Sequence, residues 1–273
     1  MTEYLYHYTS IESLALILKN HTIRLNSLTE MDDKQEQLTQ DVENLGRFIF
    51  VSSWTSDAEE SIPMWKMYTN PQSGVRIKLR KNPFKWHGTN FEDFSRTFGV
   101  QPSSISDSTS ELKTFLSLTD MFKQGVYSLQ GCNGNILYEV QYTSDTALLE
   151  PKVLDIDEKK LTLSLGVLGK HKNLHWEFQH EWRYLMTFIP FSFNGSIEEI
   201  FADFNKTGSN MAIGKAFLPF KHYDLIIEDS YYQEMEITVS PQITAGNYVT
   251  LEALVEKYNP SATICESSLK NLI

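Results

Sequence analysis

The chain has 273 residues, of which 41% are hydrophobic and 12% aromatic, and its formal net charge is −11 at pH 7. This length allows one large domain or two small ones, and the apolar content is sufficient for a substantial core. Because binding to duplex nucleic acid depends on neutralising phosphates, an acidic chain is not expected to wrap around one. Two distant cysteines, Cys132 and Cys265, predict neither a disulfide framework nor a zinc knuckle.

The N-terminal sequence MTEYLYHYTS has no basic start and no long apolar run, so no secretion signal is expected. No apolar stretch reaches the roughly 20 residues that a membrane-spanning helix needs. These features predict a soluble, cytoplasmic protein without a membrane partner.

The predicted elements begin with a strand over residues 3–8 and a helix that follows at once. The sequence TSIE is typical of a capping box, in which Thr9 caps the helix and Glu12 reaches back, and Asn20 ends the helix. Further strands are predicted over residues 22–27, 47–56, 74–79, 135–143, 181–191, 212–220, 223–229 and 235–241, and further helices over residues 61–70, 110–124, 158–171 and 249–258.

Residues 81–135 are expected to form an irregular insertion, because Pro, Gly and Ser clusters over 81–110 show little hydrophobic period. No internal repeat or clear linker divides the chain, so residues 1–273 are predicted to form a single domain. Strands and helices follow one another without the regular βαβ alternation of a doubly wound sheet. The predicted fold class is therefore α+β, with mixed, mostly antiparallel sheets and flanking helices.

Two ionisable residues, His7 and Glu181, occur on predicted strands, where an apolar residue would pack at lower cost. His7, in YHYT, is either a core histidine bonded to a backbone carbonyl or a cleft residue that donates to a ligand hydroxyl while the backbone holds its other nitrogen. Glu181 opens strand 181–191, where a carboxylate can stabilise a positive reaction centre or accept a proton. It can equally pair with Arg183, its neighbour on the same face of the strand.

Other polar and aromatic residues have two readings as well. Ser52 and Ser53 end a strand ahead of Trp65 and Tyr68, an arrangement that suits a ribose and a stacked ring, although two aromatics three apart on a helix are also ordinary core residues. No HExxH motif is present around His171, so no metal site is expected.

The strand over residues 74–79 and the residue after it carry Arg76, Lys78 and Arg80 on one side. They form either a local basic stripe for a brief encounter with nucleic acid or a solvated strand face, and we favour the solvated face.

Several short motifs together resemble one bacterial family. The sequence YHYTS is followed by LALILKN and IRLNS, then by W…MWKMY…GVRIKL, EWRYL and ITVSP, and a terminal helix comes last. This order resembles the family called domain of unknown function 2971. That family is in turn distantly similar to the ADP-ribosyltransferase superfamily, whose members cleave NAD at the nicotinamide–ribose bond. The resemblance implies an ADP-ribosyltransferase-like core of the His-Tyr-Glu class, with NAD as substrate.

The resemblance also implies roles for particular residues. His7 matches the first-strand histidine that holds the ribose, Glu181 matches the catalytic glutamate, and Gln179 falls next to the acceptor. The middle position of the class stays open between the serine pair and Tyr68. The residues expected to bind NAD are His7, Tyr8, Thr9, Ser52, Ser53 and Tyr68.

Four functions follow as alternatives. The first is a toxin-like or anti-phage effector that cleaves NAD, in which Glu181 stabilises an oxocarbenium-like cation and an unknown macromolecule accepts the ADP-ribose. The second is a catalytically inactive nucleotide-binding, nucleic-acid-binding or sensor module. The third is an interaction domain in which His7 and Glu181 lie far apart. The fourth is phosphate transfer to NAD from an RNA end, which needs arginines in the cleft, with Arg24, Arg76 and Arg183 as candidates.

Overall fold

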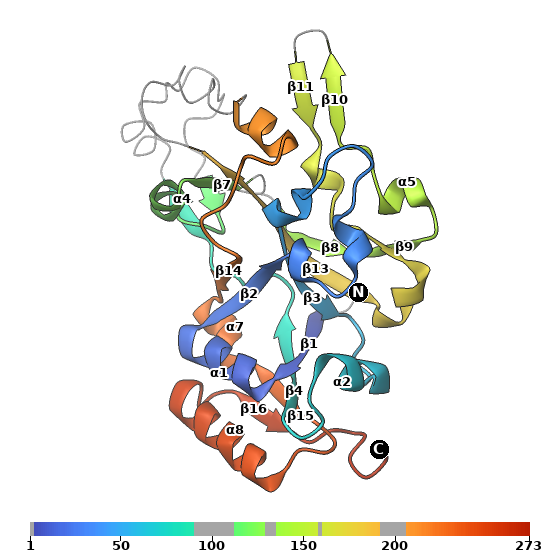
Figure 1. Cartoon of the computed structure of the whole chain (residues 1–273). Coiled ribbons are helices and arrows are strands. Elements are labelled where there is room, and N and C mark those ends of the chain that lie inside the picture. Colours follow the sequence, from blue (N-terminus) through green and yellow to red (C-terminus); the bar gives the residue numbers. More distant parts are fainter. Residues whose placement is uncertain (1–2, 90–111, 129–134, 158–159, 192–205) are drawn as a thin grey trace.

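The computed structural model describes residues 3–89, 112–128, 135–157, 160–191 and 206–273. Within these residues a 10-stranded, mixed, mostly antiparallel sheet and several helices form an α+β fold, which confirms the predicted fold class (Figure 1). No helix in the described ranges is long and apolar enough to cross a membrane.

The large sheet has one main path and one branch. The main path runs through β14 (His222–Ile226), β2 (Thr22–Ser27), β3 (Ile49–Thr55), β1 (Tyr4–Ser10), β4 (Gly74–Arg80), β15 (Glu236–Val239) and β16 (Thr263–Cys265). The branch is β13 (Glu181–Pro190), which pairs with β3, β7 (Val126–Ser128) and β8 (Leu137–Glu139). Among the described strands of this sheet, β15 and β16 form the one parallel pair, and all other pairs are antiparallel.

Three two-stranded sheets and the helices complete the described fold. The small sheets are β10 (Leu154–Asp157) with β11 (Lys160–Leu163), β12 (His171–Asn173) with β9 (Gln141–Thr143), and β5 (His87–Thr89) with β6 (Leu112–Thr114). The α-helices are α1 (Ile11–Asn20), α2 (Ile62–Tyr68), α4 (Leu118–Gln124), α5 (Thr146–Leu149), α7 (Asp229–Gln233) and α8 (Ala245–Tyr258), and residues 206–212 are also helical. Short 3₁₀ helices are η1 (Leu28–Glu30), η2 (Lys34–Gln37), η3 (Leu45–Phe48), η4 (Leu165–Val167) and η5 (Leu174–Gln179).

The described residues form two core clusters, and the smaller one gathers around Leu45, Phe48 and Leu165. The larger one includes the central strands and the helices α1 and α8, which pack against each other at one end of the molecule (Figure 1). In β4, Val75, Ile77 and Leu79 are buried in this core, and Arg76 between them is buried as well. Leu14 of α1 and Leu251 of α8 are fully buried beside them. This packing fixes the position of β1, the strand that carries His7.

Two of the three basic side chains of β4 pair with carboxylates, and the third is buried against an aromatic ring. Lys78 pairs with Glu236 at 2.7 Å, and Arg80 pairs with Glu3 and Glu234 at 2.5 and 2.7 Å. Arg76 is 7% exposed, and its guanidinium lies 4.6 Å from the centre of the Tyr6 ring. The stripe is therefore a paired strand face, not a free basic surface.

The cap of α1 lies one residue later than the sequence predicts. Ser10 has extended backbone angles, and its hydroxyl accepts the Ser13 N–H at 3.2 Å. The ladder between β1 and β4 continues to Ser10, which is in register with Gly74, so Thr9 is an interior residue of the strand and the helix begins one residue later. The strand thus extends up to the cap, and the Thr9 side chain is left to line a cavity.

Three predicted elements are wrong in part or in full. Residues 160–163 form β11, not a helix, because Leu161 and Leu163 alternate with Thr162 in a hairpin with β10. Residues 212–220 form no strand, since the helix over 206–212 is followed by irregular chain. The predicted helix over 110–124 begins only at Leu118, after β6, and residues 110–111 lie outside the described ranges.

The predicted insertion over residues 81–135 holds β5, β6, α4 and β7, so its described part is not wholly irregular. Residues 90–111 and 129–134 of this segment lie outside the described ranges.

Candidate functional site

The candidate site forms where β1 and β2, which both pair with β3, diverge from each other. Along one edge, β3 pairs with β13 over its whole length, so β2 and β1 must share the other edge. β2 pairs with Phe50 and Val51, and β1 pairs only with Thr55. Ser52 and Ser53 therefore lie at the fork between β2 and β1, where the sheet opens.

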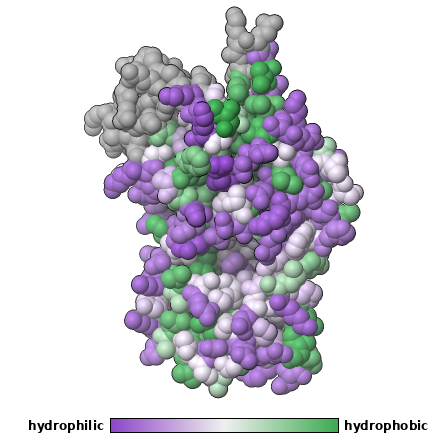
Figure 2. All heavy atoms as spheres, viewed as in Figure 1, coloured by the Kyte–Doolittle hydropathy of each residue, from purple (hydrophilic) through white to green (hydrophobic). Residues whose placement is uncertain are grey.

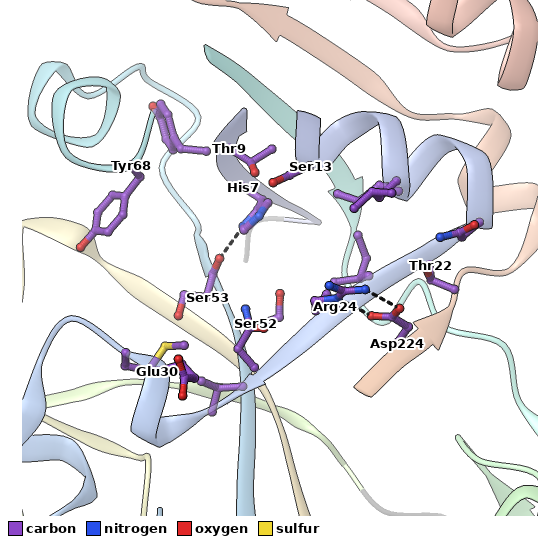
Figure 3. A pocket seen from close by; sticks show the side chains of 18 of the residues that line it. His7, Thr9, Ser13, Thr22, Arg24, Glu30, Ser52, Ser53, Tyr68 and Asp224 are labelled. Atoms are coloured by element: carbon purple, nitrogen blue, oxygen red, sulfur yellow. Dashed lines mark hydrogen bonds and ion pairs between the residues drawn. The ribbon is translucent and has the colours of Figure 1, made fainter. Parts of the chain in front are cut away.

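A cavity of about 340 Å³ lies at this fork. Figure 2 shows a hollow across the middle of the corresponding face, bordered above by largely hydrophilic residues. The lining includes all six residues predicted to bind NAD, namely His7, Tyr8, Thr9, Ser52, Ser53 and Tyr68. Arg24 and Asp224 also line it, and they form a bidentate ion pair at 2.8 and 2.9 Å (Figure 3). Its volume lies within the range of small-molecule sites.

A second, smaller cavity of about 100 Å³ adjoins the first. Six residues line both cavities, namely His7, Tyr8, Met31, Asp32, Ser53 and Tyr68. The smaller cavity adds Gln179 and Glu181, so the eight residues selected from the sequence line one two-part cleft. The histidine and the glutamate, 174 positions apart in the chain, thus line the same cavity.

His7 has a defined orientation in this cleft. Its Nδ1 lies 2.8 Å from the Ser53 carbonyl oxygen (Figure 3), and its ring centre lies 5.0 Å from that of Trp54. Because a carbonyl oxygen only accepts, Nδ1 carries the proton, and Nε2 of the neutral ring is an acceptor. Burial lowers the pKa of His7, although the bond to Ser53 opposes this shift. The expected contact between His7 and the backbone is therefore present. The hydrogen bond to a ligand hydroxyl runs in the opposite direction from the expected one, because Nε2 accepts it and does not donate.

Glu181 belongs to a buried network of four charges. Its carboxylate accepts from Arg183 Nε at 2.6 Å and from Lys172 Nζ at 2.8 Å. Glu36 completes the network by pairing with Arg183 Nη1 and, at 3.3 Å, with Lys172. Burial raises the pKa of Glu181, but the charges of Arg183 and Lys172 outweigh burial and lower it to about 2. The carboxylate is thus ionised at neutral pH, and the pairing with Arg183 offered by the sequence is real.

Gln179 and Tyr68 connect this network to the cavity. Gln179 accepts from Lys172 at 2.9 Å through Oε1, and its amide nitrogen donates to the Tyr68 hydroxyl. Burial and the nearby carboxylates of Glu181, Asp32 and Glu36 raise the pKa of Tyr68. Tyr68 is therefore a protonated phenol whose hydrogen is left for a ligand acceptor.

Sequence reasoning missed Glu36 and Lys172. Glu36 lies in a polar segment, over residues 31–44, for which the sequence predicts no strand or long helix, and Lys172 follows a segment wrongly predicted as a helix. Neither residue has a motif around it. Only a buried partner of opposite charge, distant in the sequence, distinguishes each of them from a surface residue.

His171, His175 and His180 lie outside the two-part cleft. Among the described residues, no group of three or more His, Cys, Asp or Glu side chains is placed to hold a metal ion. His180 pairs with Asp57 at 2.7 Å beside an open cavity of about 440 Å³ that Glu181 also lines.

The sequence matches no model of a known protein family, and comparisons with curated proteins and with solved structures find no match either. The resemblance to domain of unknown function 2971 and to ADP-ribosyltransferases therefore stays a prediction.

Proposed function

We propose that this chain is an ADP-ribosyltransferase-like protein that binds NAD in the two-part cleft and cleaves its nicotinamide–ribose bond. The observation that supports the proposal is the meeting of His7 and Glu181 in one cavity, which an interaction domain with scattered polar residues does not require. The acceptor is a macromolecular nucleophile, or water when the enzyme acts as an NAD glycohydrolase.

The chemistry fits the properties of these side chains. When the bond between the ribose C1′ and the nicotinamide nitrogen breaks, its electron pair leaves with the ring, and C1′ becomes cationic. Glu181 is ionised and can stabilise this cation. His7 Nε2 accepts from a ribose hydroxyl, and Tyr68 or Tyr8 stacks on the nicotinamide. The acceptor then forms a bond to C1′ and releases its proton to solvent.

One observation favours a second candidate, a nucleotide-binding module without catalysis. Glu181 is 3% exposed, and both of its carboxylate oxygens already accept from Arg183 or Lys172. A carboxylate so engaged can hold the fold of the cleft without reaching a ribose. The candidates differ in one measurable property, the release of nicotinamide.

The experiment compares wild type with Glu181→Gln, His7→Gln and the matched control Glu177→Gln, an exposed carboxylate four residues before Glu181. Each is incubated with NAD, with and without cell lysate as an acceptor source, and released nicotinamide is measured by chromatography. Calorimetry measures NAD binding separately, and circular dichroism confirms that each variant folds.

We expect release by wild type and by Glu177→Gln, with a loss of roughly 100-fold or more in Glu181→Gln. Binding of NAD without release from any variant would establish the non-catalytic module. If wild type neither bound NAD nor released nicotinamide, both candidates would be refuted.

A further inference from the structure

The smaller cavity has walls of two kinds, aromatic rings and carboxylates. Trp54, Tyr68 and Trp176 supply rings to its lining. Such walls attract a weakly hydrated cation through the negative faces of the rings. One cation already uses this wall, because the Lys172 ammonium lies 5.1 Å from the centre of the Trp176 ring.

The charges around this cavity do not balance. Four carboxylates line it, from Asp32, Asp33, Glu36 and Glu181, but Lys172 is the one cationic residue in the described lining. Arg183 adds a second positive charge from beneath, through its contacts with Glu36 and Glu181. The buried pair of carboxylates is thereby neutralised, and no described cation pairs with Asp32 or Asp33.

Two carboxylate oxygens on the wall also lack donors. Glu36 is 5% exposed, and its Oε1 accepts no hydrogen bond from the described residues, although the Lys172 ammonium lies 3.3 Å away. Asp33 Oδ2 is buried as an atom and accepts none either, while Asp33 Oδ1 accepts the Gln35 N–H at 3.0 Å. Glu36 Oε1 already has the ammonium charge of Lys172 beside it, so Asp33 Oδ2 is the buried oxygen whose cost a positively charged ligand would offset.

The volume limits what enters. An engineered apolar cavity of about 150 Å³ holds one benzene molecule. A cavity of about 100 Å³ is smaller than that, so it suits a compact ammonium group, or a single small ring that extends into the adjoining larger cavity, and not a whole nucleotide.

From these observations we propose that the smaller cavity is a binding site for a small organic cation, held between the aromatic walls and the uncompensated carboxylates of Asp32 and Asp33. The site goes beyond the proposed NAD cleavage and does not depend on it. If NAD is the ligand, the group that enters is the positively charged nicotinamide ring.

The test uses a pair of probes with nearly the same shape and different charge, benzamidine and benzamide. Calorimetry with the full chain at pH 7 measures both affinities, and 1-methylpyridinium serves as a cation that has no N–H donor. Binding of 1-methylpyridinium shows that charge is sufficient, whereas binding of benzamidine alone shows that the carboxylate oxygens also require a donor. Either result supports a cation site.

Two variants locate the site. Asp32→Asn removes the charge of an exposed residue, and Asp33→Asn removes a charge while keeping an acceptor for the helix cap. Glu43→Gln is the control, because Glu43 is exposed and lines neither part of the cleft.

We expect wild type to bind benzamidine at least about tenfold more tightly than benzamide, and each Asp variant to reduce this ratio by roughly three- to tenfold. Glu43→Gln should leave the ratio unchanged. Equal binding of the two probes by wild type, or an unchanged ratio in both Asp variants, would overturn the proposal. If the protein cleaves NAD but binds benzamidine and benzamide equally, only the cation site is refuted. If it prefers benzamidine but does not cleave NAD, only the enzymatic proposal is refuted.

Discussion

Neutralising Glu181 should destabilise the whole protein, because its charge is part of a buried network. In Glu181→Gln, Arg183 and Lys172 lose an anion that lies 2.6 and 2.8 Å from their nitrogens, and Glu36 stays as the only carboxylate of the network. The side chains of Arg183 and Lys172 are 1% and 8% exposed, so water cannot replace the lost partner. The variant thus buries an uncompensated positive charge.

The size of the effect follows from the pKa of Glu181, which is lowered from 4.5 to about 2. Since each tenfold change in an acid constant corresponds to about 1.4 kcal/mol, the native network favours the ionised carboxylate by roughly 3 kcal/mol. Breaking a buried ion pair on one side typically costs about 3–5 kcal/mol. We therefore expect Glu181→Gln to lower the free energy of unfolding by about 3 kcal/mol at pH 7.

Urea denaturation followed by fluorescence measures this change in Glu181→Gln, Lys172→Met and the double variant. The double variant restores charge balance, so its loss should be at least about 2 kcal/mol smaller than the sum of the single losses. Because the pKa of Glu181 is lowered on folding, its contribution is present above pH 4.5 and is lost as the pH falls toward 2. A loss below about 1 kcal/mol in Glu181→Gln, or additive losses, would refute this reasoning.

Three further predictions concern the cleft and the helix beside it. Burial lowers the pKa of His7, so wild type should lose stability as the pH falls below 6.5, and urea titrations at pH 7 and 5 should show a smaller loss in His7→Gln. Ser10→Ala should lower the free energy of unfolding by about 1 kcal/mol in the same assay, because α1 loses its cap; no loss would contradict the assigned cap. Asp224→Asn should remove one negative charge from the larger cavity and free Arg24, and so tighten NAD binding by roughly three- to tenfold in calorimetry; unchanged or weaker binding would contradict this reasoning.

Local sequence patterns predict the strands well where burial has period two. The alternation in GVRIKL is sufficient to place β4, and the apolar face of α1 is evident from Leu14 and Leu18. The same reasoning fails for residues 160–163, since alternating leucines beside glycines also fit a short helix. Only pairing with β10 decides between these two structures, and pairing is a tertiary property.

The candidate site shows the same division between local and distant information. His7 and Glu181 are visible in the sequence because ionisable residues interrupt apolar strands. Their position in one cavity is not visible, since it depends on the fork at which β1 and β2 leave β3. The charges of Glu36 and Lys172 are equally hidden, because a buried charge is recognised by its partner and not by its neighbours in the chain.

The charge distribution of the cleft constrains how a dinucleotide could bind. The smaller cavity holds uncompensated carboxylates, so a diphosphate is repelled there, and the larger cavity offers the single cation Arg24 among its described lining residues. Glu30, Asp32 and Asp224 line the same cavity, which leaves it negative as well. A ligand such as NAD would therefore be held by its positive ring and by hydrogen bonds from side chains such as Ser13 and Ser52, and not by neutralised phosphates. Since salt weakens interactions between charges in water far more than hydrogen bonds in a cavity, the affinity for NAD should depend only weakly on ionic strength.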